Sequence, residues 1–172
     1  MKDKMGARSV RKLLNQNSFV TLSILVIAVD LLWLQQEELT YERITIFSLI
    51  LVLYYYMHLH LQRTGIPISS QSDLRELQAL YGKPIIIEIY SNFSIACLFV
   101  TPMLDLLEKE LADEIGVIRI NVQTRNGTRM AENLCLDFVP TFIVLNKDGM
   151  EIWRKVGLAS RRMLQAQIEP LL

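Results

Sequence analysis

The chain has 172 residues, 51% of them hydrophobic, and its 18 Lys and Arg residues balance 18 Asp and Glu residues, so its formal net charge is zero. Without an excess of basic residues, the composition excludes the electrostatic footprint of a nucleic-acid-binding protein. The only cysteines are Cys97 and Cys135, which excludes a disulfide-stapled scaffold and is typical of a reducing compartment.

Two apolar runs, residues 19–34 and 44–61, predict helices that cross a membrane. With a rise of about 1.5 Å per residue, these helices are roughly 24 and 27 Å long, slightly shorter than a hydrocarbon core of about 30 Å. A signal peptide is the rival interpretation of the first run, but no small-residue cleavage site follows it. The sequence therefore favours a transmembrane helical hairpin within residues 18–62, with membrane lipid as a partner.

The charges that flank the runs predict the orientation. Because positively charged flanks stay on the cytoplasmic side, both termini and the C-terminal domain are expected in the cytoplasm. If the first run, which contains Asp30, does not span, the domain lies on the opposite face. The basic residues of the tail at 1–17 are Lys2, Lys4, Arg8, Arg11 and Lys12, and the acidic residues of the connector at 35–43 are Glu37, Glu38 and Glu42.

Polar side chains within the hairpin have two interpretations each. Asp30 is a functional candidate because an acid inside a membrane is costly, but snorkelling toward the interface is favoured. The tyrosines at residues 54–56 precede His58 and His60, which could form a haem or metal site. An aromatic belt at the level of the lipid headgroups is the favoured interpretation, so no metal or cofactor is predicted.

A short linker, residues 63–71, separates the hairpin from a domain at residues 72–172, because Gly65 and Pro67 interrupt the helical pattern. Residues 85–90 have the continuous apolar pattern of a strand buried on both faces. The expected elements are a helix from Ser72 or Asp73, a strand at 85–90, a helix at 94–115 kinked at Pro102, a strand at 117–122, a helix at 128–136, strands at 142–145 and 151–156 joined by the Asp148-Gly149 turn, and a helix capped by Ser160. This order predicts an α/β domain with a mixed sheet flanked by helices.

The run from Glu88 to Cys97, followed by Val139, Pro140 and Thr141, resembles the thioredoxin family. The resemblance covers roughly residues 72–172 and implies a thioredoxin-like fold. It also implies a cis peptide bond between Val139 and Pro140, opposite a site at the start of the helix. The further matches are Glu88 at the position of a buried acid, Tyr90 and Phe93 at aromatic positions, and Pro102 at the helix-kinking proline.

The motif departs from the family at the position that carries its chemistry. Ser94 stands where the attacking thiol is expected, at an exposed helix N-terminus, and Cys97 stands where the resolving thiol is expected. A hydroxyl cannot form a disulfide, so a two-thiol cycle within this motif is excluded. Ile95 and Ala96, between the two, are bulkier and more apolar than the usual Gly and Pro.

Each candidate residue also has a structural interpretation. Ser94 is favoured as a helix N-cap that accepts from the amide of Ala96 or Cys97. Cys97 is favoured as an inert core residue over a reactive thiol, and Glu88 is left open between a relic of proton transfer and another role. Cys135 is favoured as a packing residue, because pairing it with Cys97 requires Cα atoms within about 7 Å.

Two functions remain. The favoured one is a membrane-anchored binding or assembly module, for a protein partner or membrane complex, whose groove adds an extended peptide as a strand. The alternative is a monothiol thiol-disulfide oxidoreductase that acts through Cys97, with Glu88 as a second catalytic candidate. The residues expected to form the groove are Phe93, Ser94, Ile95, Val139, Pro140 and Thr141.

Overall fold

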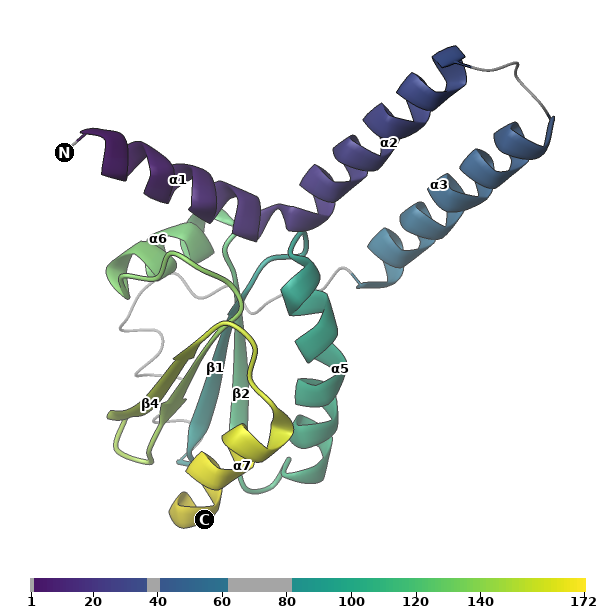
Figure 1. Cartoon of the computed structure of the whole chain (residues 1–172). Helices are drawn as coiled ribbons and strands as arrows, with labels where there is room; N and C mark the ends of the chain where they lie inside the picture. Colours follow the sequence, from purple (N-terminus) through teal and green to yellow (C-terminus); the bar gives the residue numbers. More distant parts are fainter. Residues whose placement is uncertain (1, 37–40, 62–81) are drawn as a thin grey trace.

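The computed structural model of the chain describes residues 2–36, 41–61 and 82–172, and it consists of three N-terminal helices and an α/β domain (Figure 1). The predicted linker at 63–71 and the helix expected from Ser72 or Asp73 lie outside the described residues. The helices are α1 (Lys2–Gln16), α2 (Ser18–Gln36), α3 (Tyr41–Leu61), α5 (Ile95–Glu110), α6 (Arg125–Asn133) and α7 (Arg161–Ile168), and the strands are β1 (Ile85–Tyr90), β2 (Gly116–Asn121), β3 (Thr141–Leu145) and β4 (Glu151–Val156).

The four strands form one mixed sheet in the order β2-β1-β3-β4. β1 pairs in parallel with β2 and antiparallel with β3, and β3 pairs antiparallel with β4. All six residues of β1 are buried, as expected for a central strand covered on both faces. The predicted mixed α/β sheet is confirmed.

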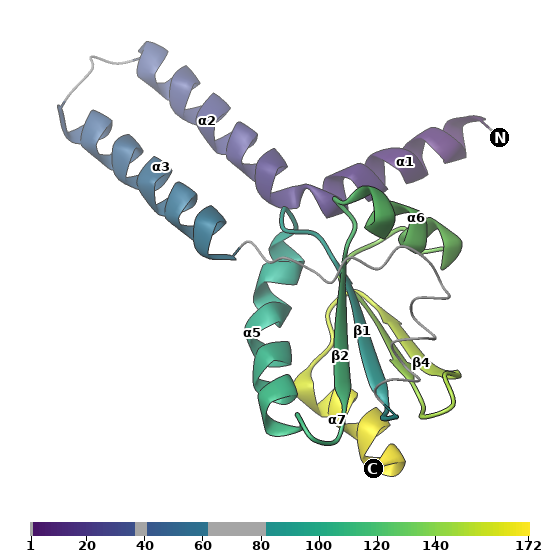
Figure 2. The same cartoon turned by 180° about the vertical axis from the view of Figure 1, so that it is seen from behind.

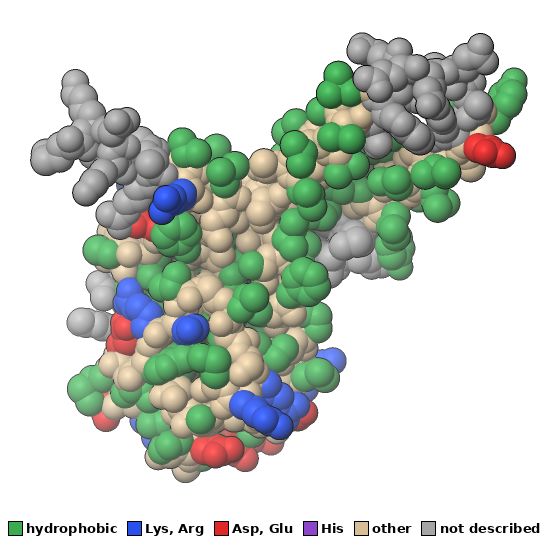
Figure 3. All heavy atoms as spheres, viewed as in Figure 1, with side chains coloured by type: hydrophobic (Ala, Val, Ile, Leu, Met, Phe, Trp, Pro, Cys, Tyr) green, Lys and Arg blue, Asp and Glu red, His purple; other side chains and the backbone are tan. Residues whose placement is uncertain are grey.

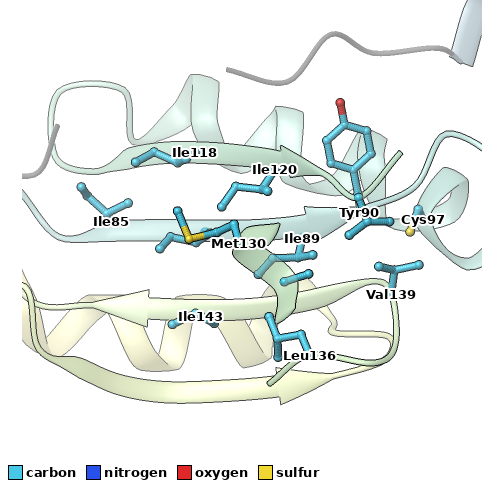
Figure 4. Packing of buried hydrophobic residues seen from close by; sticks show 13 residues of the cluster. Ile85, Ile89, Tyr90, Cys97, Ile118, Ile120, Met130, Leu136, Val139 and Ile143 are labelled. Carbon is cyan, nitrogen blue, oxygen red and sulfur yellow. The ribbon is translucent and has the colours of Figure 1, made fainter. Parts of the chain in front are cut away.

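Helices cover both faces of this sheet (Figure 2). On one face, α5 and α7 pack over a cluster that includes Ile86, Leu104 and Phe142. On the other face, Met130 of α6 packs with Ile89 and Ile143, among other residues (Figure 4). These two apolar layers position the loop after β1 and the loop before β3 at the same edge of the sheet.

Two helix boundaries differ from the predictions for local reasons. Helix α5 ends at Glu110 rather than at residue 115, because Ile115 leaves the helix and is buried in the core just before β2. Helix α6 begins at Arg125 rather than at residue 128, because the Thr124 side chain accepts a hydrogen bond from the amide of Gly127. The cap that Ser160 was expected to provide for α7 is confirmed, since its side chain accepts from the amide of Met163.

The basic tail predicted at residues 1–17 contains a helix that was not predicted. This helix, α1, meets α2 at an elbow above the domain (Figure 1). Val10, Leu13 and Leu14 are exposed and follow the three- and four-residue spacing of one helix face. Figure 3 shows hydrophobic side chains along this elbow and along the helices beyond it.

Helices α2 and α3 run side by side as an antiparallel pair (Figures 1 and 2). The rings of Phe19 and Tyr54 stack between them, with their centroids 4.5 Å apart. Within the described residues, no single helix is both long enough and apolar enough to meet the usual criterion for a membrane span. The criterion of length and hydropathy for a membrane span is met by a bent pair of helical segments, Ser9–Gln16 and Ser18–Val29, which meet at an angle of 82°. This pair is compatible with a membrane crossing or a signal sequence.

Candidate functional site

The loop between β1 and α5 holds the motif residues and is shaped by its own hydroxyl groups. The amide of Phe93 donates to Ser91 Oγ at 3.1 Å, and the amide of Ser94 donates to the Ser91 carbonyl at 3.2 Å. Ser94 is the N-cap residue of α5, with extended backbone, but its side chain makes no capping hydrogen bond with the helix as described. The predicted Ser94 cap is therefore wrong, and so is its predicted exposure, because Ser94 is fully buried.

The first amide of α5 is capped by another helix. The N–H of Ile95 donates to Ser18 Oγ at 3.0 Å, and Ser18 is the first residue of α2. Helix N-termini leave their first amides without intrahelical acceptors. Ser18 therefore fills the capping role that was assigned to Ser94.

Cys97 lies in the core and is only 1% exposed. Burial raises the pKa of its thiol from 9.0 to about 12, the negative charge of Glu88 adds to the rise, and contacts with Ser91 and Ser94 partly offset it. Figure 4 shows Cys97 beside Val139 and Tyr90 at one end of the apolar cluster. Because the thiolate is the nucleophile, Cys97 is held in its unreactive form.

Glu88 is buried in the middle of β1 and faces Arg119, its register partner on β2. Arg119 Nε lies 3.3 Å from Glu88 Oε2. The same guanidinium reaches two carboxylates of α5, Asp105 at 3.0 Å and Glu108 at 2.7 Å. Glu88 thus belongs to an ion network that connects β1, β2 and α5.

The predicted cis peptide bond between Val139 and Pro140 is confirmed. Its neighbours are fixed by backbone acceptors: Thr141 Oγ1 donates to the Phe138 carbonyl at 2.7 Å, and the Gly157 amide donates to the Pro140 carbonyl at 2.8 Å. Val139 and Thr141 are buried. The amide of Val139 donates to Asn15 Oδ1 at 2.7 Å.

The N-terminal helices therefore cover the site. We define the junction segment as residues 15–19, where α1 meets α2. Besides the contacts of Asn15 and Ser18, Ser91 Oγ donates to the Gln16 carbonyl at 2.6 Å, and the amide of Phe19 donates to the Phe93 carbonyl at 2.9 Å. The groove that was expected to be open to an extended peptide is thus filled by a helical elbow of the same chain.

Cys135 is exposed rather than packed, so this prediction is wrong. The residue has a positive φ of 55° and follows the end of α6. Its amide donates to the Glu132 carbonyl, and the amide of Leu136 donates to the Ala131 carbonyl, which is a Schellman motif. The left-handed position of this motif directs the Cys135 side chain outward while Leu136 enters the core, and both thiols of the chain are free.

Within the described part of the chain, no cluster of three or more His, Cys, Asp or Glu residues could hold a metal ion. The side chains of His58, His60 and Asp30 lie outside the described residues, and their interpretations remain predictions.

The motif, the cis-proline and the sheet order define a thioredoxin-like α/β domain. The thioredoxin family model matches residues 70–170, so the chain belongs to the thioredoxin family. It is 30% identical over 101 residues to the chloroplastic thioredoxin Y of Oryza sativa subsp. japonica, covering 59% of this chain and 58% of that protein. It is 28% identical over 87 residues to a thioredoxin of Mycobacterium tuberculosis, covering 51% of this chain and 72% of that protein.

The chain spans only part of the length of several curated relatives, from 34% to 58% for the first three. Among solved structures, the Fasciola hepatica thioredoxin is similar with a TM-score of 0.52 at 23% identity, covering 60% of this chain and 96% of that one. This similarity concerns the fold alone. The family model, which matches residues 70–170, does not include the junction segment.

Proposed function

We propose that this chain is a membrane-anchored member of the thioredoxin family that binds a protein partner, or joins a membrane complex, without thiol-disulfide exchange. The observation that carries the proposal is the state of the motif, where a buried serine and a buried, protonated cysteine replace a reactive pair. The site proposed for binding is the groove beside Pro140, which the junction segment occupies in this structure.

The motif lacks the thiolate with which thiol-disulfide exchange begins. Exchange begins when a thiolate attacks a disulfide sulfur. With a pKa of about 12, Cys97 has on the order of one thiolate in 10⁵ molecules at pH 7. Ser94 cannot resolve a mixed disulfide, so turnover within the motif has neither a first nor a second step.

The same groove offers hydrogen-bonding groups for a polypeptide. The amides of Val139 and Ile95 are donors, and the carbonyl of Phe93 is an acceptor. All three are used by the junction segment in this structure. A site whose backbone groups already hold a polypeptide segment supports a binding function rather than a catalytic one.

The anchor is proposed to be the α2 and α3 hairpin, with two spans and the domain in the cytoplasm. Both helices carry large apolar side chains that are exposed, including Ile24, Leu25, Leu49 and Val52, and exposed apolar surface of this extent suits lipid contact. Lys147→Cys in a Cys97→Ala, Cys135→Ala background tests the orientation. An impermeant maleimide should not modify this cysteine in intact cells, and ready modification contradicts a cytoplasmic domain.

Reduction of insulin by dithiothreitol tests the absence of thiol chemistry. The unaltered protein and its Cys97→Ala variant should both leave the uncatalysed rate unchanged. Catalysis by the unaltered protein that disappears in Cys97→Ala contradicts the proposal and supports a monothiol oxidoreductase acting through Cys97.

A further inference from the structure

We propose that the groove beside Pro140 recognises a helix junction of the form Asn-x-x-Ser-Phe, and that Asn15 to Phe19 of this chain is its resident ligand. The inference rests on the proposed function, because it concerns the same groove, and it names the chemistry of the segment that the groove binds. The ligand is a helical elbow that offers two side-chain oxygens and the backbone amide of Phe19, not an added strand.

The two side-chain oxygens accept hydrogen bonds from two separate backbone amides. Asn15 Oδ1 accepts from the amide of Val139 at 2.7 Å, directly before the cis-proline. Ser18 Oγ accepts from the amide of Ile95 at 3.0 Å, at the start of α5. Because Ser94 makes no capping hydrogen bond within the described structure, the oxygen of Ser18 is the one that caps α5.

The spacing of the two residues follows from the elbow. Asn15 is near the end of α1, Ser18 begins α2, and the two helices diverge by 82°. The elbow brings one oxygen to the loop before β3 and the other to the loop after β1. A continuous helix or an extended strand has a different direction at residue 17, so it does not present both oxygens to these two loops.

The backbone of Phe19 adds a further contact with the groove, while its ring packs against the hairpin. The amide of Phe19 donates to the Phe93 carbonyl at 2.9 Å, and its side chain is buried while its ring stacks on Tyr54 of α3. On the other side, Ser91 Oγ donates to the Gln16 carbonyl. The domain therefore forms a hydrogen bond with every residue from Asn15 to Phe19, and the longest is the 3.4 Å bond that Gln123 Nε2 donates to Asn17 Oδ1.

The consequence is a closed site that is coupled to the helices. The junction segment must leave before another segment of the same chemistry can bind, and its departure changes the position of α1 and α2 relative to the domain. While the junction segment is bound, its contacts with the groove hold the domain next to the start of α2.

A thiol placed beneath the segment tests the proposal. The full chain carrying Ser94→Cys, Cys97→Ala and Cys135→Ala is treated with a small maleimide in detergent micelles. Adding Asn15→Ala and Ser18→Ala should raise the modification rate at least tenfold, because residue 94 is fully buried and adjoins Ile95, whose amide donates to Ser18. The matched control adds Thr21→Ala and Ser23→Ala, which remove side-chain hydrogen bonds internal to the junction and α2, and should leave the rate unchanged.

Two further measurements separate a lost ligand from a damaged fold. Ser18→Thr keeps the hydroxyl oxygen and should retain the slow rate. A synthetic peptide with the sequence of residues 9–19 should slow the modification of the opened variant, whereas the same peptide with alanine at positions 15 and 18 should not. If the opened variant does not fold, Asn15→Ala and Ser18→Ala are tested singly, each with an expected rise of at least threefold.

Equal rates in the closed and opened proteins overturn the inference, as does equal slowing by both peptides. Neither result depends on the reductase assay. A catalytic parent protein refutes the proposed function while leaving the labelling experiment informative about the resident ligand.

Discussion

The middle of β1 and the end of β1 lie only a few residues apart but are stabilised by different parts of the chain. Around Glu88, the partners are Arg119 of β2 and the acids of α5, all within the domain. Around Ser91 to Ile95, the partners are residues 16, 18 and 19 of the N-terminal helices. The comparison shows a charged network whose members all lie within the domain, and a site completed by the N-terminal helices.

The two regions also differ in what their polar groups do. The ion network of Arg119 satisfies a buried carboxylate inside the sheet, which is a structural requirement of any residue like Glu88. The amides of Val139 and Ile95 instead lie at the edge of the sheet, where they donate to Asn15 and Ser18 of the N-terminal helices. In this chain, these polar groups of both regions have partners within the same chain.

Removal of Arg119 should have the largest effect on stability. Arg119→Ala leaves Glu88 buried without its opposite charge, and the free energy of unfolding should fall by about 3–5 kcal/mol. Chemical denaturation followed by circular dichroism measures this. The matched control is Arg161→Ala, which breaks an exposed pair with Glu110 and should cost at most about 1 kcal/mol. Similar losses in both variants contradict the role of the network.

Alkaline pH should destabilise the protein through Cys97. The pKa of this thiol is raised by burial to about 12, so the native state keeps a proton that the unfolded state releases above about pH 9. The contribution to stability is complete below pH 9 and is lost as the pH rises toward 12. Between pH 8 and pH 10, the contribution of Cys97 to the free energy of unfolding should fall by about 1 kcal/mol.

Variants of the two thiols isolate this pH effect. Cys97→Ala should remove that part of the decline in unfolding free energy between pH 8 and pH 10, whereas Cys135→Ala should retain it because Cys135 is exposed. A decline that is the same in both variants assigns the pH dependence to other groups and contradicts a protonated, buried Cys97.

Cys135→Gly should have the smallest effect and the opposite sign. Cys135 has a φ of 55° at the left-handed position of the Schellman motif, where glycine has no steric penalty. The substitution should raise the free energy of unfolding by about 0.5–1 kcal/mol. Destabilisation measured in the same denaturation assay contradicts this account of the end of α6.

The difference between the two regions also explains what could be predicted from the sequence. Residues 85–90 and the Asp148-Gly149 turn carry local patterns, and the resemblance placed the cis bond at Pro140, so the sheet and the cis-proline loop were predicted correctly. The pairing of Glu88 with Arg119 depends on the register of β1 and β2, which a local pattern does not specify.

The junction segment could not be predicted in the same way. Asn15 and Val139 are 124 residues apart, and no periodicity connects an asparagine side chain to a distant amide. One available signal was missed: Val10, Leu13 and Leu14 have helical spacing, but the tail was interpreted by its charge. The predictions for Ser94 and Cys135 failed because a capping oxygen came from Ser18 and because the end of α6 turned the cysteine outward.

Alkylation of the native protein tests the central claim most directly. Iodoacetamide at pH 8, followed by mass spectrometry of the peptides that contain each cysteine, compares the two thiols within one molecule. The account predicts that Cys135 is modified while Cys97 remains unmodified until the protein is unfolded, after which both react. Modification of Cys97 in the folded protein at a rate similar to that of Cys135 would contradict a buried, protonated thiol and a site without thiol chemistry.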